Sequence, residues 1–362
     1  DGRTDNLSSD DATSYLTGVD TDYLGWNRSL SLGDFDGDGQ LDVVVGGTYV
    51  NSNSTGGIYI VDGLDYADWA DDVDDIAIAD IDGAGRYGHF GSMMPHQSDF
   101  DDDGYLDLAV AGVDYYYGDY YGTVAGSIFL GGSGGITGNY DADDGDYLLT
   151  DAVSYYWYTL LDVGMDFNGD GKNDAVYADS VGYSSSQQDG FIYIVSGDDM
   201  GSGGEYDLDD DSELYFYGNS EYDYLGNSLA GGDIDGDGAD DLIVGAPGDD
   251  NEADNGGCVF IVNGQSGLSG SASVSFIQDV TICGTEDDAS LGGGAGSILA
   301  DIDGDGADDL VLSAYGAGEV YVFLDASTLS GTLDTDDADI TITGDGPEAF
   351  GISMAAGDFD GD

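Results

Sequence analysis

One short acidic stretch recurs along this chain, and it limits the possible folds more than any other feature. Its first copy reads Asp34-Phe-Asp-Gly-Asp-Gly-Gln-Leu-Asp42, with aspartate at positions 1, 3, 5 and 9 and glycine at position 6. Complete copies begin at residues 34, 99, 166, 233 and 301, and a sixth, beginning at 358, is truncated by the end of the sequence. This regular spacing predicts a repeat architecture with one loop in each unit.

The side chains of this stretch suit a hard cation. Calcium takes about six to eight oxygen ligands, mostly carboxylates, and a backbone carbonyl at position 7 can add another. Glycine at position 6 permits a backbone conformation that other residues resist. Magnesium fits less well, because it keeps several of its waters. The expected calcium ligands, with position 7 included for its carbonyl oxygen, are Asp34, Asp36, Asp38, Gln40, Asp42, Asp99, Asp101, Asp103, Tyr105, Asp107, Asp166, Asn168, Asp170, Lys172, Asp174, Asp233, Asp235, Asp237, Ala239, Asp241, Asp301, Asp303, Asp305, Ala307, Asp309, Asp358, Asp360 and Asp362.

Two other interpretations of the stretch are weaker. An Asp-Gly turn is common in any acidic, glycine-rich chain, but five complete copies at matched spacing argue against chance. An EF-hand requires glutamate at position 12, whereas the first copy has Val45 there. Strand-like residues, not a helical pattern, follow each complete copy. The sequence therefore predicts five complete calcium loops that join strands, and a sixth that is truncated.

The charge of the chain restricts its partners. Its 362 residues include 76 Asp and Glu but four Lys and Arg, and the net charge is −72. Repulsion excludes nucleic acid and anionic membrane surfaces as partners. Five calcium ions would offset only a small part of this charge. Screening in salty or divalent-rich water is the favoured explanation, and a cationic or metal-bridged partner is the alternative.

The sequence has no membrane-spanning or targeting signal. No run of about 18 apolar residues is present, so membrane insertion is not expected. No secretory signal opens the chain, which is therefore expected to be a mature form or an excised piece.

Each unit carries four strand-like runs, named A to D here, with the acidic loop between A and B. β-branched and aromatic residues dominate these runs, and Gly and Asp bound them. Run A precedes the loop, as at 225–232, and run B follows it, as at 241–247. Run C is expected at 58–61, 128–130, 191–195, 259–262 and 320–323, and run D at 75–78, 147–149, 214–216, 280–282 and 340–342. Four antiparallel strands repeated about a centre predict an all-β fold, a β-propeller with one four-stranded blade per unit.

Short glycine motifs recur at fixed places around the loops. Phe90-Gly91 and Phe350-Gly351 open two units, Leu225-Gly226 opens another in a similar way, and Gly245-Ala-Pro247 follows one loop. The third unit departs from this pattern, with Trp157-Tyr158 at its opening. With the acidic loops between them, these motifs resemble the FG-GAP repeats of integrin α-subunit propellers and their bacterial relatives. The resemblance covers nearly the whole chain and implies a seven-bladed, calcium-binding, extracellular propeller.

Residues 1–362 are expected to form a single propeller of at least six blades. Residues 12–17 resemble a D strand with no A, B or C before it, and residues 350–357 resemble the A strand of the last blade. The matching B and C strands are missing, so the domain is expected to be incomplete at its C-terminal end or to be completed by another molecule. The two ends of the chain, 358–362 and 1–5, would together spell one acidic loop, which leaves self-assembly open, although chance is the favoured explanation.

The two cysteines occupy related places in the fourth unit. Cys258 begins run C, and Cys283 ends run D. Antiparallel neighbours bring those two ends together, so a cross-strand disulfide is predicted, with two free thiols as the alternative. A disulfide would indicate an oxidising compartment.

Ligand candidates are expected on the face opposite the calcium loops. In a propeller the A–B and C–D connections share one face, and the B–C and D–A connections share the other. Two aromatic segments fall on the second face, where rings beside carboxylates suit sugars, cationic groups or a protein partner. Packing of these loops against each other is the competing explanation, and the acidic segment 249–254 is expected to be a solvated loop. The aromatic candidates are Tyr115, Tyr116, Tyr117, Tyr120, Tyr121, Tyr155, Tyr156, Trp157 and Tyr158.

No motif marks a catalytic centre. His89 and His96 are the only histidines, neither belongs to a recognisable triad or zinc pattern, and no carboxylate pair stands out among so many. The sequence therefore predicts a non-catalytic, secreted or cell-surface, calcium-binding propeller that recognises an extracellular protein or glycan. Two alternatives remain open, a structural subunit of a surface fibre or layer and the accessory propeller of an extracellular hydrolase or lyase.

Overall fold

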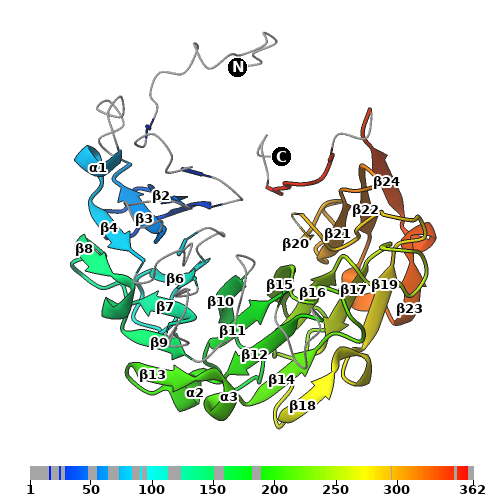
Figure 1. Cartoon of the computed structure of the whole chain (residues 1–362), viewed down its shortest axis with the longest axis horizontal. Coiled ribbons are helices and arrows are strands. Elements are labelled where there is room, and N and C mark those ends of the chain that lie inside the picture. Colours follow the sequence, from blue (N-terminus) through cyan, green and yellow to red (C-terminus); the bar gives the residue numbers. More distant parts are fainter. Residues whose placement is uncertain are drawn as a thin grey trace.

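The fold is a series of β-sheets arranged around an arc. The computed structural model describes residues 16–17, 24–25, 29–47, 55–63, 73–83, 90–91, 96–112, 124–150, 159–181, 189–294, 296–345 and 349–357. Within these ranges five sheets follow one another in chain order around the arc (Figure 1). This arrangement of blades is the predicted all-β propeller. No helix within these ranges has the length and apolar character needed to cross a membrane.

Each sheet contains four antiparallel strands in the order A, B, C, D. The first sheet comprises β1 (Leu30–Gly33), β2 (Asp42–Gly47), β3 (Gly57–Val61) and β4 (Ala79–Asp82). The second comprises β5 (His96–Ser98), β6 (Asp107–Ala111), β7 (Gly126–Phe129) and β9 (Tyr147–Thr150). The third comprises β10 (Thr159–Met165), β11 (Asp174–Asp179), β12 (Phe191–Val195) and β14 (Leu214–Tyr217). The fourth comprises β15 (Ser228–Gly232), β16 (Asp241–Ala246), β17 (Cys258–Val262) and β19 (Val280–Cys283). The fifth comprises β20 (Ser297–Ala300), β21 (Asp309–Ala314), β22 (Glu319–Phe323) and β24 (Ile340–Thr343).

Four of the sheets carry a fifth strand that the sequence patterns did not predict. These strands lie in the C–D connection of one blade and pair in parallel with the D strand of the blade before it. They are β8 (Gly138–Asp141), β13 (Gly204–Asp207), β18 (Gly270–Ser273) and β23 (Gly331–Asp334). In Figure 1 they form the outer rim of the arc, while β10, β15 and β20 lie on its inner side. Each of these strands joins the backbone of one blade to its predecessor.

A short helical turn follows each fifth strand and buries its first residue in the core. These turns are η4 (Ala142–Asp144), α3 (Leu208–Asp211), η5 (Val274–Phe276) and η7 (Thr335–Asp337), and α1 (Val73–Ile76) takes the same place in the first blade. Two further turns, α2 (Gly197–Met200) and η6 (Ala326–Thr328), follow C strands. The D run predicted at 75–78 is therefore wrong. Val73 is fully buried in the turn, the helix continues to Ile76, and the strand β4 begins only at Ala79.

Two A runs also differ from the prediction. The run predicted at 225–232 becomes a strand only at Ser228, because Gly226 turns to donate its N–H to the carbonyl of Gly245 at 2.9 Å. The A strand predicted at 350–357 is not a strand, since residues 349–357 form turns, bends and irregular chain. Its B-strand partner is not among the described residues, although Ser313 donates a hydrogen bond to the carbonyl of Gly351 at 2.7 Å.

The hydrophobic core lies between neighbouring sheets. Ile58 and Ile60 of the first sheet pack with Leu108, Val110 and Phe129 of the second. The same arrangement recurs between the second and third, third and fourth, and fourth and fifth sheets. Strands β3, β12 and β17 are buried along their whole length. Burial of these apolar C strands on both faces stabilises the stack of blades.

Glycines in the B strands allow neighbouring blades to approach closely. A Cβ on Gly46 would lie 2.0 Å from the carbonyl oxygen of Gly91, and one on Gly245 would lie 2.1 Å from that of Gly292. Gly91 is the second residue of a Phe-Gly motif, and Gly292 follows Leu291 at the matching place. The first glycine of Gly-Ala-Pro is therefore required by the contact between one blade and the next.

The predicted D strand at 12–17 is described only at its last two residues. Leu16 packs with Val45, Tyr59, Val61 and Val73 of the first blade. The N–H of Val73 donates to the carbonyl of Thr17 at 2.7 Å. Thr17 thus lies beside the C–D connection of the first blade. The D strands of the first four blades lie in the same way beside the C–D connection of the blade that follows. The rest of 12–17 lies outside the described residues.

Candidate metal centre

The acidic loops join A strands to B strands, and the same pattern of hydrogen bonds recurs within each complete loop. In the first loop Asp34 Oδ2 accepts the N–H of Gly39 at 2.9 Å, Asp36 Oδ1 accepts that of Asp38 at 3.0 Å, and Asp38 Oδ1 accepts that of Gln40 at 2.8 Å. The carboxylate at position 1 meets the N–H at position 6 in the other loops as well, at Gly104 (2.9 Å), Gly171 (2.8 Å), Gly238 (3.2 Å) and Gly306 (3.0 Å). The N–H groups of each loop therefore gather its carboxylates on one small turn.

Glycine at position 6 is required by the backbone and not by crowding. Its φ is +88° in Gly39, and the values in the other complete loops lie between +89° and +96°. L-residues with a side chain rarely adopt such angles. A Cβ would meet nothing within 4 Å at any of the five positions, so space is not the constraint. This explains why position 6 is glycine in every complete copy.

The aspartate at position 9 holds the loop to the rest of its blade. Asp241 Oδ2 accepts the N–H of Ile234 at 2.9 Å, and its Oδ1 accepts that of Gly264 at 2.9 Å, from the beginning of the C–D connection. The corresponding bonds from the C–D connection reach the carboxylates of Asp42, Asp107, Asp174 and Asp309. All five aspartates are at most 1% exposed. Position 9, predicted only as a metal ligand, also links the A–B and C–D connections on one face.

Burial leaves these carboxylates without a compensating positive charge. Desolvation raises the pKa of Asp107 and Asp241 to about 6 and that of Asp174 to about 7, despite the N–H groups that favour ionisation. The one lysine or arginine in the described ranges is Lys172, whose Nζ pairs with Asp198 at 2.7 Å. A bound cation would supply the missing charge.

The donor atoms of the loops fit such a cation. Carboxylate oxygens lie within 4.8 Å of one another in the sets Asp34–Asp36–Asp42, Asp99–Asp101–Asp107 and Asp233–Asp235–Asp237. The buried Oδ1 of Asp99 has no hydrogen-bond partner among the described residues, whereas its Oδ2 accepts from Gly104. Clustered hard oxygens with an unused buried acceptor are the donor set that calcium prefers. The residues present therefore fit calcium.

The remaining predicted ligands have mixed outcomes. The backbone N–H of position 7 donates to the carboxylate at position 5 and so holds position 7 in the turn. In the fourth loop, for example, the N–H of Ala239 donates to Asp237 Oδ1 at 2.9 Å. Lys172, at position 7 of the third loop, directs its side chain to Asp198, so it leaves its carbonyl as the group considered for a cation. The sixth loop, with Asp358, Asp360 and Asp362, lies outside the described residues.

One acidic residue beside the loops escaped the sequence analysis. The carboxylate oxygens of Asp36, Asp38 and Asp62 lie within 4.8 Å of one another, although Asp62 belongs to the C–D connection. Antiparallel pairing of β2 with β3 brings Val61 opposite Val43, next to the loop. The signal was therefore present in the order of the strands, because the residue after strand C must lie beside the start of strand B.

The predicted aromatic ligand face falls outside the described residues. This applies to all nine candidates between Tyr115 and Tyr158 and to His89. His96 begins β5, and its backbone pairs with Ala109. The aromatic candidates therefore enter the proposal below as sequence-based predictions.

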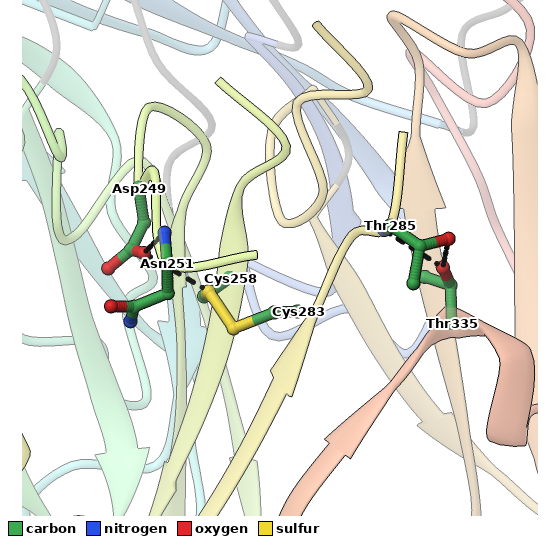
Figure 2. The surroundings of a disulfide bond; sticks show 6 residues. All are labelled: Asp249, Asn251, Cys258, Cys283, Thr285 and Thr335. Carbon is green, nitrogen blue, oxygen red and sulfur yellow. Dashed lines mark hydrogen bonds between the residues drawn. A yellow bond between two sulfur atoms is a disulfide. The ribbon is translucent and has the colours of Figure 1, made fainter. Parts of the chain in front are cut away.

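The face opposite the acidic loops holds the predicted disulfide. Cys258 of β17 lies opposite Cys283 of β19 in the antiparallel ladder, and the two are joined (Figure 2). Asp249 Oδ1 lies 3.3 Å from Cys258 Sγ, a contact without a proton because the sulfur is in the disulfide. Thr285, two residues beyond the bridge, meets Thr335 of the next blade through hydroxyl oxygens 3.1 Å apart. The disulfide therefore joins strands C and D of the fourth blade close to the place where this blade contacts the fifth.

Replacing both cysteines by alanine is expected to lower the free energy of unfolding by about 3 kcal/mol, because a loop of 25 residues is no longer closed in the unfolded chain. Urea denaturation of the double variant and of the wild type in calcium measures this difference. Wild-type protein unfolded with reductant present should show the same loss. Equal midpoints for the double variant and the oxidised wild type would contradict the expectation.

Two buried carboxylates lie on this face, and one of them, Asp249, contacts the disulfide. Asp223 is 2% exposed and Asp249 is 3% exposed, so the expectation of a solvated segment at 249–254 is wrong for its first residue. Asp249 is drawn inward because its Oδ1 accepts the N–H of Asn251 at 2.8 Å. Burial, and then repulsion from Asp249, raise the pKa of Asp223 to about 7.

This shift predicts that stability falls as pH rises from about 4 to about 7. The folded chain keeps the proton of Asp223 up to its pKa of about 7, whereas the unfolded chain releases it near the ordinary value of 3.8. The contribution is about 1.4 kcal/mol per pH unit in that window and is constant above it. Asp223→Asn should lower the slope by about 1.4 kcal/mol per pH unit and be more stable than the wild type at pH 8, in urea midpoints measured from pH 5 to 8. The exposed control Asp210→Asn should keep the wild-type slope, and a wild-type slope in Asp223→Asn would refute the assignment.

Comparison with known proteins agrees with this architecture. The FG-GAP repeat family matches residues 26–61 and 225–261. Integrin alpha-5 of Xenopus laevis is 32% identical over 178 residues, which are 47% of this chain and 16% of the integrin. Phosphatidylinositol-glycan-specific phospholipase D of Rattus norvegicus is 31% identical over 193 residues, 52% of this chain and 22% of that enzyme. The chain thus spans about a fifth of the length of these curated relatives.

A solved structure of the rhamnogalacturonan lyase YesW is also similar. The matched region covers 83% of this chain and 49% of the lyase chain, with 14% sequence identity and a TM-score of 0.37. The assignment of this chain rests instead on the repeats in its sequence and on its own five sheets. This chain is a β-propeller that carries FG-GAP repeats.

Proposed function

We propose that this chain is a calcium-stabilised, non-catalytic propeller that recognises an extracellular protein or glycan. The observation that supports calcium is the set of buried carboxylates at position 9. Their pKa values are raised where a shift is resolved, and within the described residues the one lysine or arginine is already paired. A divalent cation at each loop would relieve this unfavourable burial.

Calcium would act as a staple in each blade. In the first loop Asp34, Asp36, Asp38 and Asp42 would hold it, and the cation would neutralise their mutual repulsion. The loop's carboxylates already bind its own N–H groups, and Asp42 also accepts the N–H of Gly63 at 3.2 Å. Bound calcium would therefore fix the A–B loop against the C–D connection. The opposite face would remain available for a partner.

An extracellular location is proposed from the disulfide and from the calcium loops, since both suit an oxidising, calcium-rich medium. The aromatic segments 115–121 and 155–158 are the proposed contact region for a glycan or protein. A second candidate is the accessory propeller of a larger hydrolase or lyase. The match to about a fifth of a phospholipase D favours this candidate.

The direct test is the number of calcium ions bound per chain, by metal analysis after equilibrium dialysis against calcium. Five or six tightly bound ions would support the proposal. A chain that binds no calcium would refute it. Capture of glycan or protein partners by the wild type, lost in Tyr116→Ala with Trp157→Ala, would support recognition. Polysaccharide turnover by the isolated chain would contradict the non-catalytic role. Particle size rising with concentration would favour a structural subunit.

A further inference from the structure

The residue that directly follows each C strand lies beside the acidic loop of its own blade. In the first blade this residue is Asp62, whose carboxylate lies within the 4.8 Å set that includes Asp36 and Asp38. Asp62 therefore brings an oxygen donor to the loop from a different connection.

The same position carries different chemistry in the other blades. In the fourth blade Asn263 Nδ2 donates to Asp235 Oδ2 at 3.2 Å. In the third blade Ser196 Oγ accepts from Asn168 Nδ2 at 2.9 Å. The second and fifth blades have leucine there, Leu130 and Leu324, which offers no side-chain oxygen. The position thus ranges from charged through neutral polar to apolar.

We propose that the residue after strand C, where its side chain carries an oxygen, is a cation ligand from outside the loop, and that the chemistry of this position sets the calcium affinity of each blade. The inference rests on the proposed calcium function. Affinity in oxygen-ligated calcium sites is tuned by the number of charged ligands. Asp62 gives the first site five carboxylates, which its loop alone does not supply. The first site is therefore the tightest of the complete loops.

The third site lies at the opposite extreme. Its loop has Asn168 at position 3, so Asp166, Asp170 and Asp174 are its only loop carboxylates, and Ser196 adds a neutral oxygen. The second, fourth and fifth loops have four carboxylates each at the ligand positions 1, 3, 5 and 9. As the calcium concentration rises, the site of the first blade therefore fills before the others, and that of the third blade fills last.

A reciprocal exchange tests the proposal, because the chain offers both states of the position. Calorimetric titration of the full chain with calcium chloride is compared for the wild type, Asp62→Asn and Asn263→Asp. Asp62→Asn should weaken the tightest site about tenfold, and Asn263→Asp should add a second tight site. Without calcium the thermal midpoints should move the other way, up for Asp62→Asn and down for Asn263→Asp, because a carboxylate has been removed from or added to an uncompensated cluster.

The variant Asp210→Asn removes one exposed negative charge, in helix α3, that belongs to no acidic loop, and it should leave the isotherm unchanged. Circular dichroism in calcium checks that each variant is folded. If Asp62→Asn does not fold, Asn263→Asp still tests the proposal. Wild-type protein that binds no calcium would overturn the proposed function and this inference with it. Calcium binding by the wild type with the same isotherm in both exchange variants would overturn this inference alone.

Discussion

Excess chelator is expected to lower the unfolding temperature of the chain by tens of degrees. At a free calcium concentration about a hundredfold above the dissociation constant, each ion that binds only the folded state contributes about 2.7 kcal/mol. Five such loops together contribute about 13.5 kcal/mol, which is comparable with the whole net stability of about 5–15 kcal/mol typical of folded proteins. Differential scanning calorimetry in calcium and in chelator measures the effect directly.

Controls must separate binding from screening, because a chain with net charge −72 is also stabilised by any salt. Calcium added beyond the chelator should restore the original transition. Sodium chloride at matched ionic strength should restore only part of it, and magnesium should be less effective than calcium. Full recovery in sodium chloride alone would show that the loops are acidic turns whose repulsion is merely screened.

Asp241→Leu is expected to destabilise the chain by about 3–5 kcal/mol even without calcium. The substitution removes the acceptor of the N–H groups of Ile234 and Gly264, which meet Asp241 at 2.9 Å. An unpaired buried donor costs about 1–3 kcal/mol. Loss of the position-9 ligand adds to this cost when calcium is present. Urea denaturation in chelator and in calcium measures the two contributions separately.

Asp237→Asn is the matched control in the same loop. Asp237 is exposed, and its Oδ1 accepts the N–H of Ala239, an acceptor that asparagine keeps. This variant should lose stability in calcium while it matches or slightly exceeds the wild type in chelator. If Asp241→Leu also matched the wild type in chelator, position 9 would act only through the cation. The hydrogen-bonded link that Asp241 makes between the A–B and C–D connections would then contribute nothing to stability.

Much of the fold could be predicted because its signals are local. The B and C strands combine β-branched residues with flanking glycines, and Cys258 and Cys283 lie opposite each other because neighbouring strands are antiparallel. The fifth strands had no such signal. β18 reads Gly-Ser-Ala-Ser, with no large apolar residue, and its partner β14 belongs to another blade. Its pairing depends on the completed neighbour and not on its own composition.

The site shows the same division between local and tertiary information. Spacing alone identified the loop carboxylates, because they follow one another within nine residues. The second role of Asp241 depends on burial and on an N–H that lies 23 residues further along the chain. Asp62 was missed because its link to the loop arises from strand pairing. Both residues are found only when the A–B and C–D connections are considered as one face.

The fifth strands also have a consequence for the time at which each blade matures on the ribosome. β4 ends at Asp82, but its parallel partner β8 begins only at Gly138. At about 5–20 residues per second, the outer edge of the first blade stays unpaired for several seconds after its own strands have been made. Each of the first four blades is therefore completed only when the next blade has been synthesised. A newly made chain always presents one incomplete edge, the one closest to the ribosome.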